Sequence, residues 1–156
     1  MATSERSTLA KARAYCARQE RCQQEVRDKL YAWGEHRAQV EAIISSLIGE
    51  GFLNEARFAE HFAVSKARQK GWGARKIEQA LRLKQVSEPC IKLGLKAIDA
   101  EEATERLQGL VAKRWARERE PDPFRKRQKV IAYFLRKGYD PERIAEAIQA
   151  DRDAAS

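Results

Sequence analysis

The sequence predicts an all-α protein, built as an elongated array of three tandem three-helix repeats. Apolar residues recur three and four positions apart, as in Val26 and Leu30, and they do not alternate as in a half-buried strand. Ala, Leu, Glu, Lys, Arg and Gln dominate, and all are good helix formers. The apolar pattern then returns twice at a spacing of about 50 residues, which is typical of a repeat.

The repeat is defined by three anchor residues, Leu30, Leu81 and Phe134, which are 51 and 53 positions apart. An aliphatic residue stands four positions before, ten after and fourteen after each anchor. These residues are Val26, Val40 and Ile44 in the first copy, Ile77, Ile91 and Leu95 in the second, and Val130, Ile144 and Ile148 in the third. This pattern predicts two helices in each copy.

A further helix precedes each anchor helix. We expect these helices near residues 5–18, 54–70 and 99–119. The predicted repeats then cover residues 5–50, 54–98 and 99–150. The alternative is a single irregular helical bundle in which the matching positions coincide by chance.

The helix boundaries repeat as well. Gly34 and Gly138 lie four residues after their anchors, where a helix that ends in the left-handed conformation favours glycine. The second copy has Gln85 there, so Gln85 either adopts that conformation or the helix ends differently. Asp140 is a good N-cap residue for the next helix, whereas His36 is a weaker one.

No candidate active site or metal site emerges from the sequence. His36 and His61 are its only histidines, and neither has a partner at metal-ligand spacing. Cys16, Cys22 and Cys90 form no CxxC pair, so neither a disulfide framework nor a zinc site is expected. We expect Cys16 and Cys22 to lie half-buried on helices. A phosphate loop is also missing, so we expect a binding protein that is not an enzyme and uses no cofactor.

Apolar runs fall far short of the ~20 residues that span a bilayer. The N-terminal segment carries Arg6 and Lys11 and lacks the apolar core of a signal peptide. We therefore expect a cytoplasmic protein with no membrane association, and the lack of a long heptad seam favours a monomer. The 31 basic and 23 acidic residues give a net charge of +8, which suits an anionic partner, although a mildly basic helical protein need not have one.

Positive charge is concentrated in two places. Residues 54–98 contain 10 basic and 4 acidic residues, and residues 113–137 contain ten and three. The candidate partner-binding residues are Arg57, Lys66, Arg68, Lys70, Trp72, Arg75, Lys76, Lys126, Lys129, Arg136 and Lys137. Basic residues around an exposed aromatic side chain suit a phosphate backbone or an acidic protein groove. The alternative is a solvated helix face with Trp72 as local packing.

Three segments resemble a known family. Residues 51–60 read Gly-Phe-Leu-Asn-Glu-Ala-Arg-Phe-Ala-Glu, and residues 70–77 read Lys-Gly-Trp-Gly-Ala-Arg-Lys-Ile. Together they resemble the central signature of RecX regulatory proteins, and Phe-Leu-Arg-Lys-Gly-Tyr at 134–139 resembles that family's third repeat. The similarity covers roughly residues 8–149. One departure is Leu-Lys-Gln-Val at 83–86, where the family usually has Lys-Gly before an aliphatic residue.

The resemblance implies three tandem three-helix repeats that bind in the groove of the RecA–DNA filament, across neighbouring RecA subunits. It also implies lower RecA ATPase, strand-exchange and co-protease activity, with no cofactor. Contact with the backbone of single- or double-stranded DNA is a further expectation. The alternative is a helical-repeat DNA-binding protein acting directly on nucleic acid. A base-reading helix needs Arg, Asn or Gln aimed at one groove, whereas the Arg and Lys residues here are spread along the chain.

Overall fold

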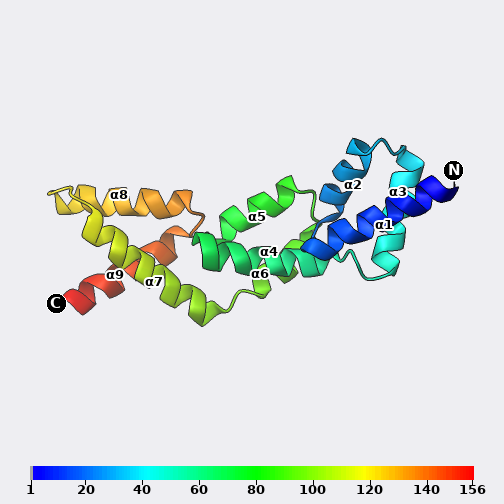
Figure 1. The fold of residues 1–156 in the computed structure, drawn as a ribbon. Coiled ribbons are helices and arrows are strands. Elements are labelled where there is room, and N and C mark those ends of the chain that lie inside the picture. The colour runs from blue at the N-terminus through cyan, green and yellow to red at the C-terminus, as the bar shows by residue number, and fades with distance from the viewer. Residues whose placement is uncertain (1) are drawn as a thin grey trace. The chain divides into compact units, whose positions relative to one another are not determined.

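The described part of the chain is helical throughout. The computed structural model describes residues 2–156, with side chains from Arg6 onward. These residues form nine helices and no strand (Figure 1). The helices are α1 (Ala2–Arg18), α2 (Gln23–Ala32), α3 (Arg37–Gly49), α4 (Glu55–Lys70), α5 (Ala74–Leu83), α6 (Glu88–Lys96), α7 (Ala100–Arg117), α8 (Pro123–Arg136) and α9 (Pro141–Ala155). The all-α prediction is confirmed.

Contacts divide the described chain into two compact units. Unit 1 comprises the chain up to His61 together with Leu81–Gly94, and unit 2 comprises Phe62–Ala80 and Leu95–Ser156. In unit 1, α1, α2 and α3 pack on one another (Figure 1). In unit 2, α7 crosses α9, and both contact α8. The repeat boundaries at 5–50, 54–98 and 99–150 stay a prediction.

The cores contain the residues that the repeat pattern matches. Eleven of these twelve described residues are buried, each with at most 3% of its surface exposed. The twelfth, Leu95, is half-buried, because it lines a cavity of about 290 Å³ in unit 2 whose wall also includes Trp72. Burial of one such aliphatic side chain contributes about 1.5–3 kcal/mol, so these positions hold each unit together.

The three anchor helices end in the same hydrogen-bonded turn. The backbone N–H groups of Glu35, Val86 and Tyr139 donate to the carbonyl oxygens of the anchors Leu30, Leu81 and Phe134, each at 3.1 Å. The residue before each donor is left-handed, with φ of 91° at Gly34, 63° at Gln85 and 98° at Gly138. This is the Schellman pattern of helix ends. Gln85 therefore adopts the conformation that glycine has in the other two copies.

Gln85→Gly is expected to stabilise the protein by about 1 kcal/mol. A side chain in the left-handed conformation costs about 1–2 kcal/mol, and the greater freedom of glycine in the unfolded chain offsets part of that gain. Chemical denaturation followed by circular dichroism measures the difference. The matched control is Gln79→Gly in the middle of α5, where Gln79 is exposed and glycine costs about 1 kcal/mol. A destabilising Gln85→Gly would contradict the assigned strain.

The N-cap position of Asp140 is confirmed, whereas the half-buried state expected of Cys16 and Cys22 is wrong. Asp140 is the N-cap residue of α9, but its side chain makes no capping hydrogen bond and forms an ion pair of 2.7 Å with Arg75. Cys22 lies at the N-cap of α2 and is fully buried, where its N–H donates to the Glu25 carboxylate at 3.0 Å. Burial raises the pKa of the Cys22 thiol to about 12. Cys16 does lie on a helix, but it too is buried and not half-buried.

Candidate functional site

The turn between α4 and α5 organises one side of unit 2. Helix α4 ends at Lys70, and α5 begins at Ala74 after three turn residues. The Tyr139 hydroxyl donates to the carbonyl oxygen of Gly71 at 2.8 Å. Because Tyr139 is itself buried, this hydrogen bond fixes the turn that carries Trp72.

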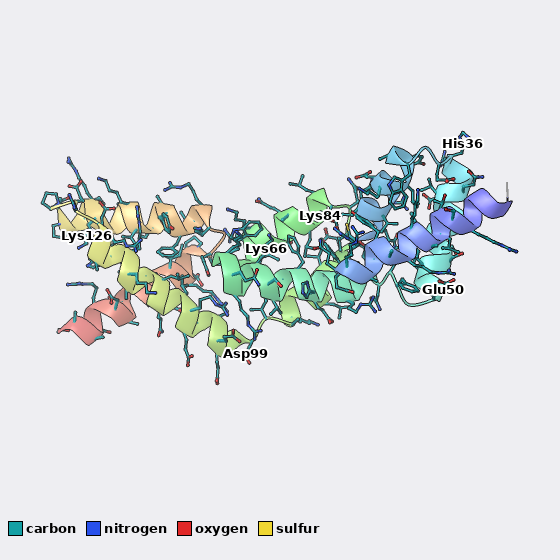
Figure 2. All side chains as sticks on the ribbon, viewed as in Figure 1. His36, Glu50, Lys66, Lys84, Asp99 and Lys126 are labelled. Carbon is teal, nitrogen blue, oxygen red and sulfur yellow. The ribbon has the colours of Figure 1, made fainter. Side chains whose placement is uncertain are left out.

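Trp72 is half-buried and has a lysine ammonium group near its ring from each of the flanking helices. The Lys66 Nζ lies 5.1 Å from the ring centroid, and the Lys76 Nζ lies 4.7 Å from it. Phe62 meets the indole ring edge-on, with 6.4 Å between centroids. Figure 2 shows Lys66 on α4. Each cation–π contact contributes about 0.5–1 kcal/mol at an exposed site, so Trp72 packs locally within a basic surface.

Three of the predicted arginines form ion pairs with carboxylates far away in the sequence. The pairs are Arg57 with Glu20 at 2.6 Å, Arg68 with Glu102 at 2.8 Å, and Arg75 with Asp140 at 2.7 Å. The hydrogen bond from Arg68 lowers the pKa of Glu102 below its ordinary value. Exposed pairs of this kind contribute little to stability. An anionic partner therefore competes with a carboxylate already in place at each of these arginines.

The four candidates near the end of the chain have different surroundings. Lys126 lies 4.6 Å from the ring centroid of Trp115, and Lys129 forms an ion pair of 3.0 Å with a glutamate of the preceding loop. Within the described residues, neither Arg136 nor Lys137 forms an ion pair with a carboxylate. The Lys137 ammonium instead lies 5.8 Å from the ring centroid of Tyr133.

Sequence reasoning missed a basic cluster on α7. Lys113, Arg114 and Arg117 line a pocket of about 140 Å³ in unit 2, together with Lys70 and Lys137 from the candidate list. The basic run that contains them was recognised, but its members on α7 were not selected. Their spacing is a usable signal, because Lys113 and Arg117 are four residues apart and so share one helix face.

A second missed cluster lies in unit 1, where two aromatic rings are surrounded by cations. Tyr15 and Trp33 meet edge-on with 6.3 Å between centroids. The Arg21 guanidinium lies 3.9 Å from the Tyr15 ring, and the Lys29 ammonium lies within 6 Å of both rings. Lys11 lies 5.8 Å from Trp33. Aromatic rings flanked by cations therefore occur in both units.

Two other kinds of feature are absent from the described residues. No group of three or more described His, Cys, Asp or Glu side chains is placed to hold a metal ion. No described helix is long and apolar enough to cross a membrane.

Comparison with known proteins gives the same family for sequence and fold. Models of the second and third three-helix domains of RecX match residues 54–95 and 100–148. The regulatory protein RecX of Halorhodospira halophila is 32% identical, with 88% of this chain and 84% of that protein covered. The RecX of Ralstonia pickettii is 28% identical over 91% of this chain and 86% of its own. The chain spans only 56% of the Clostridium perfringens RecX, to which it is 32% identical.

A solved structure supports the fold. The crystal structure of RecX from Lactobacillus salivarius matches with a TM-score of 0.88 at 23% identity, covering 97% of this chain and 99% of that one. At that identity the likeness establishes the helical-repeat fold alone. The two domain models and the Halorhodospira relative show that the chain belongs to the RecX family of regulatory proteins.

Proposed function

We propose that the protein binds the RecA nucleoprotein filament and lowers its ATPase, strand-exchange and co-protease activities. The match to two RecX three-helix domains over residues 54–95 and 100–148 carries this proposal. Those segments also contain Trp72 with the lysines beside it, and the basic residues of α7 and α8. The regulatory role in the names of the relatives is consistent with a protein that acts by binding.

Several modest contacts act together in this proposal. A chain that touches neighbouring filament subunits converts each later contact into an intramolecular event, so the contacts reinforce one another. The protein then acts as a monomer in the cytoplasm, where the filament forms, and it needs neither a catalytic site nor a cofactor of its own. Single substitutions in one contact are expected to weaken binding without abolishing it.

The first test is a titration of RecA ATPase activity on single-stranded DNA. Adding the protein is expected to lower the rate of ATP hydrolysis in a saturable manner, and the protein alone is expected to hydrolyse no ATP. Raised salt is expected to weaken the inhibition, because exposed charge contacts are screened. A RecA rate that stays flat through the titration would overturn the proposal.

Charge reversal locates the filament contact. Lys66→Glu combined with Lys70→Glu is expected to raise strongly the protein concentration needed for half-inhibition of RecA ATPase activity. The reason is that both residues belong to the basic residues around Trp72 in unit 2. The control carries the same charge change at Arg6 and Lys11, both exposed in unit 1, and is expected to matter less. Circular dichroism checks that helicity is intact in both. Equal damage from the two pairs would place the contact elsewhere.

Direct nucleic-acid binding is the second candidate function, and one observation favours it. The α7 pocket has basic residues in its wall and no carboxylate among its described lining residues. That chemistry suits a phosphate backbone, which carries no sequence information by itself.

A further inference from the structure

The strongest unassigned feature of the molecule is the pocket of about 140 Å³ in unit 2. It lies where the end of α4 meets α7 and α8. The side chains that give it its chemistry are Lys70, Lys113, Arg114, Arg117, Tyr133 and Lys137. Its volume is well below the about 300–1,000 Å³ of pockets that take drug-sized ligands, so it fits a small group.

Carboxylates balance the charge of several arginines elsewhere in unit 2, but not that of the pocket. Arg68 and Arg106 share the carboxylate of Glu102, and Arg75 pairs with Asp140. The pocket differs, because five of its nine described lining residues are basic and none is acidic. No ion pair with a described carboxylate joins Lys70, Lys113, Arg117 or Lys137. A cluster of like charges of this kind is relieved only by water, salt or an anionic ligand.

Arg114 shows the incomplete bonding most clearly. Its guanidinium lies 4.4 Å from the ring centroid of Tyr133. Its Nε is buried and has no hydrogen-bond partner among the described residues. The carboxylate of Glu118 is 3.9 Å from its Nη2, which is too long for a hydrogen bond. Buried donors are nearly always paired in native proteins, so the guanidinium has hydrogen-bonding capacity that no described protein group uses.

The arrangement favours a phosphate group over a nucleobase. Guanidinium forks and ammonium groups are the side chains that bind phosphate oxygens, through bidentate hydrogen bonds and point charges respectively. A base would need an open aromatic face on which to stack. The Tyr133 ring is half-buried with the Arg114 guanidinium beside it, so it is not such a platform.

We propose that this pocket binds a phosphate group of a nucleic-acid strand through Lys113, Arg114 and Arg117, with Lys70 and Lys137 at its edge. The inference deepens the proposed function, because it assigns the strand of the filament as a contact of unit 2. It can be tested without RecA, so its failure and that of the proposed function are distinguishable.

The test measures fluorescence anisotropy of a labelled oligothymidine at several salt concentrations. Lys113→Glu with Arg117→Glu is expected to weaken binding at least about tenfold, because two phosphate contacts become repulsive. The gentler Lys113→Gln with Arg117→Gln is expected to flatten the slope of log affinity against log salt by about 1.4, since each single-strand contact contributes about 0.7. Both residues are exposed, so circular dichroism is expected to show unchanged helicity.

The matched control is Lys92→Glu with Lys96→Glu on α6. These lysines are also exposed and four residues apart, and the total charge change is the same. The control is expected to weaken binding only about two- to threefold, through the long-range field alone. Equal losses in the two reversed pairs would overturn the proposal, because the effect would then belong to net charge.

Inorganic pyrophosphate distinguishes a strand from a free anion. If pyrophosphate raises the melting temperature of the wild type but not of the glutamine variant, while oligothymidine binding is equal in the two, a free anion is the ligand and the strand assignment fails. If the wild type binds the strand through this pocket but leaves RecA unaffected, the inference stands and the proposed function fails.

Discussion

Gly138→Ala is expected to destabilise unit 2 by about 2–5 kcal/mol. Gly138 has a φ of 98°, and an added Cβ would lie 2.5 Å from the backbone nitrogen and the Cβ of Lys76. The left-handed conformation costs an alanine about 1–2 kcal/mol, and forcing an atom into a packed contact costs about 1–3 kcal/mol more. Gly73 is equally tightly packed against this turn. A Cβ added to Gly73 would lie 2.5 Å from the Gly138 carbonyl carbon.

The control for this change is Gly34→Ala. Gly34 ends its anchor helix in the same turn with a φ of 91°, but an added Cβ would meet nothing within 4 Å. It is expected to cost only the conformational part, about 1–2 kcal/mol. Hydrogen exchange of the local peptides measures each effect within its own unit. If the two alanines cost the same, the close approach of α5 and α8 is not what Gly138 provides.

The same exchange experiment has a direct structural readout. The N–H of Gly73 donates to the Lys137 carbonyl at 2.8 Å, and that of Arg75 donates to the Gly138 carbonyl at 3.0 Å. These two amides are the donors that the added Cβ would push away. Their exchange is expected to accelerate in Gly138→Ala and to stay unchanged in Gly34→Ala.

Leu81→Ala is expected to cost about 2–5 kcal/mol, the range measured for buried leucines. Leu81 is fully buried, so the truncation removes apolar contacts and leaves a cavity. Leu83, two residues later on α5, is 83% exposed, and Leu83→Ala is expected to change stability by less than about 0.5 kcal/mol. Chemical denaturation of the two variants gives the comparison. A Leu81→Ala variant as stable as Leu83→Ala would mean that the middle anchor is wrongly assigned.

Local patterns predicted the fold well, because helices and their ends are encoded by residues a few positions apart. The periodicity located the buried anchors, and Gly34 and Gly138 marked two helix ends correctly. Gln85 shows the limit of such reasoning. The position of Gln85 in the repeat indicated a left-handed residue, whereas its identity as a glutamine did not. The hydrogen bond from the Val86 N–H to the Leu81 carbonyl shows that this helix ends in the same turn as the other two anchor helices.

The candidate site was harder to predict, because its properties depend on contacts between distant segments. Arg57, Arg68 and Arg75 are separated from their carboxylate partners by 34 residues or more. No local pattern reports such pairs, so the selected arginines and lysines looked equally available. The N-cap role of Asp140 was predicted from its position, but the side chain points to an ion pair that only the packing of α9 near α5 creates.

The two backbone hydrogen bonds that join Gly73 and Arg75 to the end of α8 can form only late in synthesis of the chain. Gly73 and Arg75 leave the ribosome about 60 residues before the carbonyl groups that accept their hydrogen bonds. At about 5–20 residues per second, that interval lasts about 3–12 seconds. During this time the nascent α5 can form its own turns, but its first amides have only water as a partner. A chain that stops before Lys137 therefore lacks the carbonyl groups that accept these two hydrogen bonds.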